Sequence, residues 1–137
     1  MSTVIRPNVS SNNPYYISKH RYYELKHHCL QYNEWKQELL KLRSRSLIQS
    51  HMIHCGKNIR SDDKTAYTGL LSAHMTTLMY NVEKCSVEAG GDIANYIFTA
   101  VTEGKSYSTL NPPCGKEYFY KKYRMFFYLL SQNYSSP

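Results

Sequence analysis

Apolar residues recur along this chain at intervals of three and four positions, the spacing that places them on one face of an α-helix. Alternation of apolar and polar residues, which is typical of strands, does not extend over any useful length. The pattern therefore predicts an all-α fold, a small helical bundle of five or six helices. The expected helices cover residues 18–32, 33–49, 62–88, 92–103 and 115–131, with a short helical turn at 106–110.

Several residues mark the ends of these helices. Ser18 and Asn33 are suited to cap a helix N-terminus, because their side-chain oxygens accept hydrogen bonds from unpaired backbone N–H groups. Gly90-Gly91 and Gly104 are suited to end helices, because glycine adopts the left-handed conformation without steric cost. The stretch 50–61 predicts a loop.

The apolar stripes predict which side chains are buried. They are Tyr22, Leu25, Cys29 and Tyr32; Trp35, Leu39 and Leu42; Tyr67, Leu71, Met75 or His74, Leu78, Val82 and Cys85; Ile93, Tyr96, Ile97, Ala100 and Val101; and Phe119, Tyr123, Phe126 with Phe127, and Leu130. The helix expected at 62–88 is long for a small domain, at roughly 36 Å. Two interpretations fit it: the spine of the bundle, or half of a dimer seam that makes the chain a homodimer.

The length of 137 residues fits one domain. Residues 1–14 are polar and predict a flexible N-terminal arm, and residues 15–137 predict a single helical domain, with 15–91 as its helical scaffold. No apolar stretch reaches the ~18 residues of a membrane span, and residues 1–14 lack the apolar segment of a signal peptide. We therefore expect a cytoplasmic location and no membrane partner. The four cysteines form no C-x-x-C pair, and in the cytoplasm we expect their thiols to be reduced.

The charge of the chain favours a polyanionic partner. Lysine and arginine total 17 against 10 aspartate and glutamate residues, which gives a formal net charge of +7 at pH 7. Residues 18–60 hold nine basic and three acidic side chains, so the excess is concentrated. Because each neutralised phosphate releases condensed counterions, such a field favours nucleic acid.

Enzyme chemistry has little support in the sequence. It holds no P-loop, no G-x-S-x-G and no H-E-x-x-H motif, so we expect no enzymatic activity and no cofactor. Two clusters, His27-His28-Cys29 and His51, His54 with Cys55, contain ligands that zinc prefers, but their spacings match no standard zinc pattern. Ordinary histidines are the favoured interpretation, and no metal site is predicted.

The segment 92–137 has the element order of a helix-turn-helix: a supporting helix, a short helix, a break at residues 111–113, and a basic aromatic helix. A recognition helix needs positive charge and donors near its N-terminus, because its backbone amides also favour phosphate there. Lys116, Lys121 and Lys122 supply charge, and Tyr118 and Tyr120 supply hydroxyls. The segment therefore predicts a C-terminal helix-turn-helix-like unit.

Two blocks of the chain resemble the two ends of a family of small uncharacterised proteins from phages and mobile elements of Firmicutes. They are residues 17–36, ISKHRYYELKHHCLQYNEWK, and residues 96–130, with AVTEGKSYSTL and PCGKEYFYKKYRMFFYLL. That family is distantly similar to ArpU-type and sigma-like phage transcription regulators. The resemblance implies a regulator-like helix-turn-helix in a bacterial host cytoplasm. Family members have several more residues before the PC dipeptide, whereas here Asn111 and Pro112 alone follow Leu110, which puts the first helix of the motif in doubt.

Together these patterns predict a phage-encoded protein that binds duplex DNA, as a transcriptional regulator, through its C-terminal helix. The expected nucleic-acid-binding residues are Lys116, Tyr118, Tyr120, Lys121, Lys122 and Arg124, with Lys19, Arg21, Arg43 and Arg45 as auxiliary phosphate contacts. The alternative is a phage-encoded inhibitor of a host defence nuclease, similar to an anti-CRISPR protein, that docks on a host nucleoprotein. Fourteen tyrosines favour this alternative, because tyrosine is enriched at protein interfaces.

Overall fold

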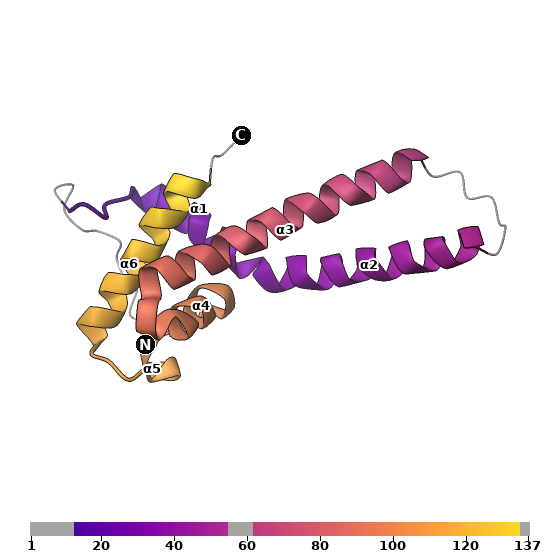
Figure 1. Cartoon of the computed structure of the whole chain (residues 1–137). Coiled ribbons are helices and arrows are strands. Elements are labelled where there is room, and N and C mark those ends of the chain that lie inside the picture. The colour runs from indigo at the N-terminus through magenta and orange to yellow at the C-terminus, as the bar shows by residue number, and fades with distance from the viewer. Residues whose placement is uncertain (1–12, 55–61, 135–137) are drawn as a thin grey trace. The chain divides into compact units, whose positions relative to one another are not determined.

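The computed structural model describes residues 13–54 and 62–134, and for residues 46–47, 49–54 and 62–65 it describes the backbone alone (Figure 1). These residues form six α-helices and one 3-10 helix, and no strand, which confirms the all-α prediction. The elements are α1 (Lys19–Leu30), α2 (Tyr32–His54), α3 (Asp62–Gly90), η1 (Gly91–Ile93), α4 (Ala94–Glu103), α5 (Tyr107–Leu110) and α6 (Lys116–Asn133). None of the described helices is long and apolar enough to cross a membrane.

The chain divides into two compact units. Residues 1–32 and 80–137 make one, here called the core unit, and residues 33–79 make the other, the hairpin unit. The core unit joins distant parts of the sequence because α1 packs against both α4 and α6. This division differs from the predicted grouping into a scaffold (15–91) and a C-terminal unit (92–137). Most of the predicted N-terminal arm lies outside the described residues.

The interior of the core unit is built mainly from the apolar faces of α1, α4 and α6 and from the last turns of α3. Its fully buried side chains include Leu25, Cys29, Val82, Cys85, Ile93, Ile97, Phe119, Phe126, Phe127 and Leu130. All of them belong to the stripes predicted from the helical spacing, which confirms the prediction for these positions. Burial of large side chains such as these stabilises a fold by about 1.5–3 kcal/mol each.

A group of aromatic rings joins α1 to α6 inside the core unit. The Tyr22 ring lies edge-on to Phe127 at a centroid distance of 5.0 Å, and Tyr123 lies edge-on to Phe127 at 4.9 Å. The hydroxyls of Tyr22 and Tyr123 are 3.1 Å apart, within hydrogen-bond distance. Each buried hydroxyl therefore has a partner, which offsets the cost of removing it from water.

The hairpin unit contains most of α2 and the first part of α3. Its described core is a small cluster of Leu39, Leu42 and Met75, with Trp35 and Leu71 packed against it. Trp35, Leu39, Leu42 and Met75 were all expected on buried stripes. The prediction for Tyr67 is wrong, because this side chain is 67% exposed.

Three helix ends follow the predicted capping residues. Ser18 Oγ accepts a hydrogen bond from the backbone N–H of Arg21 at the start of α1. Gly91 and Gly104 have φ of +57° and +69°, the left-handed region in which glycine ends a helix without strain. These three predictions are confirmed.

The limits predicted for the second helix are wrong. Helix α2 already begins at Tyr32, so Asn33 lies inside it and caps nothing. At the other end α2 continues to His54, beyond the loop expected to start at residue 50. Ser44 shows how a serine is accommodated in this helix, since its hydroxyl donates to the Leu40 carbonyl one turn earlier. The rest of the expected loop, residues 55–61, lies outside the described residues.

Candidate nucleic-acid interface

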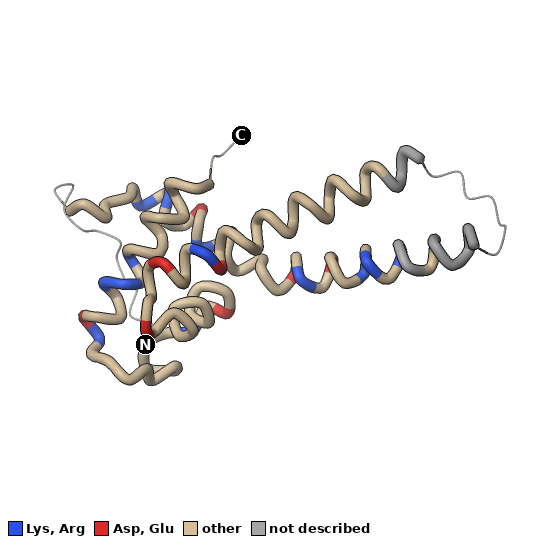
Figure 2. The backbone as a smooth tube through the Cα atoms, viewed as in Figure 1, with Lys and Arg blue, Asp and Glu red and all other residues tan. Residues whose placement is uncertain are grey.

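Helix α6 exposes a second row of side chains beside its buried stripe. Glu117, Lys121, Arg124 and Tyr128 recur at i, i+4, i+7 and i+11, so they share one face of the helix. Figure 2 shows the basic positions of α6 gathered toward its N-terminal half. The face is held in place because the opposite side of α6 is fixed in the core by Phe119, Tyr123, Phe126, Phe127 and Leu130.

The N-terminal end of α6 is not capped by a side chain. Gly115 precedes the helix in an extended conformation, with φ −72° and ψ 157°, and its carbonyl accepts the first helical hydrogen bond, from the Phe119 N–H at 3.0 Å. The backbone N–H groups of the first turn carry the positive end of the helix dipole. They lie directly beside Lys116, so backbone and side chain both favour an anion at this end.

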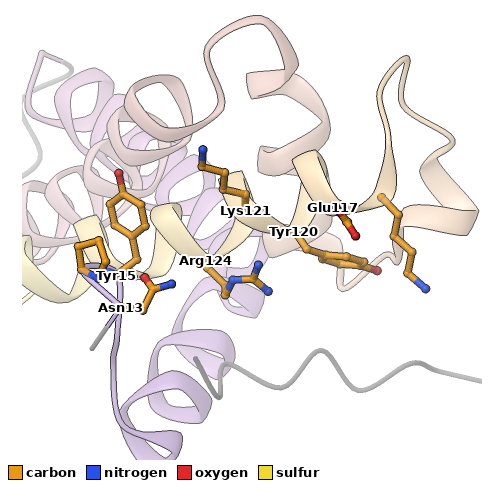
Figure 3. A pocket seen from close by; sticks show the side chains of 8 residues that line it. Asn13, Tyr15, Glu117, Tyr120, Lys121 and Arg124 are labelled. Carbon is orange, nitrogen blue, oxygen red and sulfur yellow. Dashed lines mark hydrogen bonds between the residues drawn. The ribbon is translucent and has the colours of Figure 1, made fainter. Parts of the chain in front are cut away.

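A hollow of about 800 Å³ lies along this face (Figure 3). We call it the cationic hollow; its lining residues are Asn13, Pro14, Tyr15, Lys116, Glu117, Tyr120, Lys121 and Arg124. The segment 13–15 forms one side of it and is held by a turn, since Asn13 Oδ1 accepts a hydrogen bond from the Tyr15 N–H at 2.8 Å. The Tyr15 ring stacks edge-on against Tyr128 of α6, at a centroid distance of 5.6 Å.

The cationic hollow carries an uncompensated positive charge. It is lined by three cations, Lys116, Lys121 and Arg124, against one carboxylate, Glu117. Among the described residues none of the three cations forms an ion pair, whereas Arg21, Lys84 and Lys105 each pair with a glutamate. Cations without carboxylate partners keep their hydrogen-bonding capacity for phosphate oxygens.

Tyr118 and Lys122 lie on a different face of α6 and contact each other. The Tyr118 hydroxyl donates to Asp92 Oδ1 at 3.1 Å, and the Lys122 ammonium lies 5.3 Å from the centre of the Tyr118 ring. The hydrogen bond to Asp92 raises the pKa of Tyr118, because phenolate beside a carboxylate is disfavoured. The structure therefore places these two predicted residues outside the cationic hollow.

Tyr120 was expected to face outward, but its side chain is only 8% exposed. Its ring lies against Phe119 and Tyr107, and its hydroxyl accepts a hydrogen bond of 3.4 Å from the Tyr107 backbone N–H. Tyr120 thus lines the hollow and also packs α5 against α6.

The Arg21 guanidinium contacts the C-terminal end of α6. Its Nε donates to the Ser131 hydroxyl at 3.1 Å, and its Nη2 donates to the carbonyls of Ser131 and Tyr134. A cation at this end offsets the negative end of the helix dipole. Arg21 therefore connects α1 to α6, and we leave it out of the proposed interface.

The other auxiliary residues, Lys19, Arg43 and Arg45, are exposed. Lys19 belongs to α1 of the core unit, whereas Arg43 and Arg45 belong to α2 of the hairpin unit. The structure does not bring any of the three into the cationic hollow.

The candidate metal clusters do not assemble a site within the described residues. Cys29 is fully buried, and burial raises the pKa of its thiol, so it stays protonated near neutral pH. His28 is buried beside the Tyr134 ring, at 4.4 Å between ring centroids, while His27 is exposed. No three His, Cys, Asp or Glu side chains come together in the part of the chain that the structure describes. The side chains of His51, His54 and Cys55 lie outside that part.

Asn13, Pro14, Tyr15 and Glu117 line the hollow and were not among the predicted site residues. The sequence offered one signal, since an Asn-Pro dipeptide favours a turn that brings the next residues back toward the fold. Their neighbours in space, Lys121 and Arg124, are more than 100 positions away along the chain, so helical periodicity carries no information about this contact.

No family model, no curated protein and no solved structure matches this chain. The similarity to phage regulators thus stays a prediction from the two sequence blocks.

Proposed function

We propose that the chain binds duplex DNA through the cationic hollow of α6. The observation that carries the proposal is that Lys116, Lys121 and Arg124 line one hollow without a carboxylate partner among the described residues. From the first to the last of these residues the helix rises by eight positions, about 12 Å along its axis. Such a row suits the phosphates of a duplex, which carries one negative charge per ~1.7 Å of its axis.

The uncapped N-terminus of α6 supports the same use of this face. Backbone N–H groups at a helix N-terminus bind phosphate oxygens, and the adjacent lysine adds a charge-assisted hydrogen bond. Tyr15, beside the cations, offers a ring and a hydroxyl at the edge of the contact. Lys122 and Tyr118 would extend the interface on the neighbouring face of α6.

Transcriptional control by a phage-encoded regulator is the wider role that we propose for this DNA binding. It is supported by the resemblance of residues 17–36 and 96–130 to the phage family, and by the element order α4, α5, α6. In this proposal α4 supports α6, and α5 with its left-handed Asn111 forms the turn between them. DNA binding through the cationic hollow does not depend on this finer assignment.

The proposal is tested by the salt dependence of binding to a labelled duplex, measured by fluorescence anisotropy. Each phosphate contact adds about one unit to the slope of log affinity against log salt. We therefore expect Lys121→Ala with Arg124→Ala to reduce that slope by about two units. The matched control is Lys84→Ala with Lys105→Ala, which removes the same charge from the core unit at two cations that already pair with Glu88 and Glu103.

An equal loss of slope in both double variants would mean that net charge alone drives binding, and would contradict the site. Absence of binding by the intact chain at low salt would reject DNA as the partner. In that case capture of a host protein that persists after nuclease treatment would favour the inhibitor of a defence nuclease.

A further inference from the structure

A second hollow, of about 330 Å³, lies in the core unit, where the last turns of α3 meet the first turns of α4 (Figure 1). We call it the acidic hollow; its lining includes Tyr32, Glu83, Ser86, Val87, Asn95 and Phe98. Its volume is at the lower end of the range of small-molecule sites. It shares no lining residue with the cationic hollow, so its occupation does not depend on DNA binding.

The acidic hollow carries a carboxylate that no cation neutralises. Glu83 is the one charged side chain among its described lining residues, and it accepts a hydrogen bond from the Tyr32 hydroxyl. No lysine or arginine pairs with it in the part of the chain that the structure describes, whereas Glu24, Glu88 and Glu103 each pair with a cation. The Glu83 carboxylate therefore retains its capacity to bind a cation, although the chain as a whole is basic.

The hydroxyls of the acidic hollow have no proton left for a ligand. The Tyr32 hydroxyl donates to Glu83, and burial together with this hydrogen bond raises the pKa of Tyr32, so the proton stays in place near neutral pH. The Ser86 hydroxyl donates to the Val82 carbonyl at 2.9 Å. Both oxygens still have lone pairs, and the Asn95 side chain adds a carbonyl. A ligand that is rich in hydrogen-bond donors matches these groups.

Apolar side chains lie beside these acceptors. Val87 is 65% exposed, although its side chain is aliphatic. Phe98 is half-buried, and its ring lies edge-on to the Tyr32 ring at a centroid distance of 5.0 Å. Because removal of apolar surface from water favours binding, this side of the acidic hollow suits the hydrocarbon part of a ligand.

We propose that the acidic hollow binds a small organic amine in its protonated form. An ammonium group has three donors and no acceptor, which matches the Glu83 carboxylate and the hydroxyl oxygens of Tyr32 and Ser86. The bond to the carboxylate is charge-assisted and therefore stronger than a neutral one. The hydrocarbon stem of the amine contacts Val87 and Phe98. An anionic ligand is disfavoured, because Glu83 repels it and the hydroxyls offer it no donor.

The experiment is an NMR titration of the isotope-labelled full chain at physiological salt, where the charges of distant residues are screened. The probes are phenethylammonium, phenethyl alcohol and phenylacetate, which share a stem and differ in charge. With phenethylammonium we expect saturable shifts at Ser86, Val87 and Asn95 and a dissociation constant on the order of 1 mM, typical of a very small ligand. The alcohol and the acid should bind at least about tenfold more weakly.

Two variants separate the charge from the apolar contact. Glu83→Gln removes the charge and keeps an acceptor for Tyr32, so it should weaken phenethylammonium binding at least about tenfold. The matched control is Glu88→Gln, which removes the same charge from the same helix at a carboxylate that pairs with Lys84. It should bind the amine as the intact chain does. Val87→Thr removes apolar surface without a change of charge and should weaken binding about threefold.

Far-UV circular dichroism separates a lost site from a lost fold. Glu83, Glu88 and Val87 are exposed, so their variants should retain helicity, and if Glu83→Gln does not, Val87→Thr and the three probes carry the test. A lack of saturable shifts with phenethylammonium would overturn the proposal. So would equal binding of the three probes, or equal weakening by Glu88→Gln. Tighter binding of Nα-acetyl-lysine methylamide would overturn it as well, because the site would then belong to a lysine of a protein partner.

Discussion

Arg21 Nε lies 3.1 Å from the Ser131 hydroxyl, so that a side chain of the first helix closes the C-terminal end of the last one. The two residues are 110 positions apart in the sequence. The guanidinium also lies 5.3 Å from the centre of the Tyr134 ring. Arg21 thus neutralises the carbonyl end of α6 and fixes the two helices against each other.

Replacing Arg21 by alanine is expected to lower the free energy of unfolding by about 2 kcal/mol, because hydrogen bonds to a charged group and a favourable dipole contact are lost together. Urea denaturation followed by circular dichroism measures this change. Lys19→Ala, at an exposed position of the same helix, should change stability by less than about 0.5 kcal/mol. If Arg21→Ala instead lowers the affinity for DNA and leaves the stability unchanged, Arg21 contacts DNA and does not mainly stabilise the fold.

The buried pair Tyr22 and Tyr123 predicts alkaline instability. Burial raises the pKa of both phenols above the ordinary value of 10.0, because the charged phenolate is costly to bury. Below that value both groups are neutral in the folded and the unfolded chain, so their titration does not make stability depend on pH. Above pH 10.0 the unfolded chain loses these protons first, and the free energy of unfolding falls as pH rises.

Tyr123→Phe tests this assignment through the pH dependence of urea denaturation between neutral and alkaline pH. The variant should lose about 1–2 kcal/mol at neutral pH, because the Tyr22 hydroxyl loses its partner, and its stability should fall less steeply above pH 10.0. Tyr16→Phe removes an exposed phenol and should leave the profile unchanged. An identical alkaline slope in Tyr123→Phe and the intact chain would refute the role of the buried pair.

Gly104 is required by the backbone at the end of α4. Its φ is +69°, and a Cβ at this position would lie 3.3 Å from Leu30 Cδ2. Gly104→Ala should therefore destabilise the chain by about 1 kcal/mol or more. Gly69→Ala is the natural comparison: it lies in an open, helical position of α3 and should stabilise by about 0.5–1 kcal/mol. Thermal unfolding of both variants distinguishes the two glycines by the sign of the effect.

The helices and most of the core could be predicted from sequence because both depend on local spacing. Helical periodicity placed Leu25, Ile97 and Phe126 in the core, and the structure buries all three. Capping chemistry is equally local, as Ser18 and Gly104 illustrate. The same reasoning wrongly placed Tyr67 in the core, since periodicity does not distinguish the two apolar faces of α3.

The candidate site was harder to predict because it depends on contacts between distant segments. Lys116, Lys121 and Arg124 were expected at the interface, and the structure gathers them around one hollow. Tyr120 has the same local pattern, yet it is buried because α5 packs Tyr107 against it. The contribution of Asn13 and Tyr15 arises only when segment 13–16 folds back along α6, which spacing within one helix does not encode.

The chain has a single tryptophan, Trp35, and it packs in the hairpin unit against Leu39, Leu42 and Met75. The buried tyrosines Tyr22 and Tyr123 lie in the core unit. Each unit therefore carries its own optical reporter. Indole emission follows the melting of one part of the molecule, and near-ultraviolet tyrosine dichroism follows the other, so that a single unlabelled sample distinguishes concerted from stepwise unfolding.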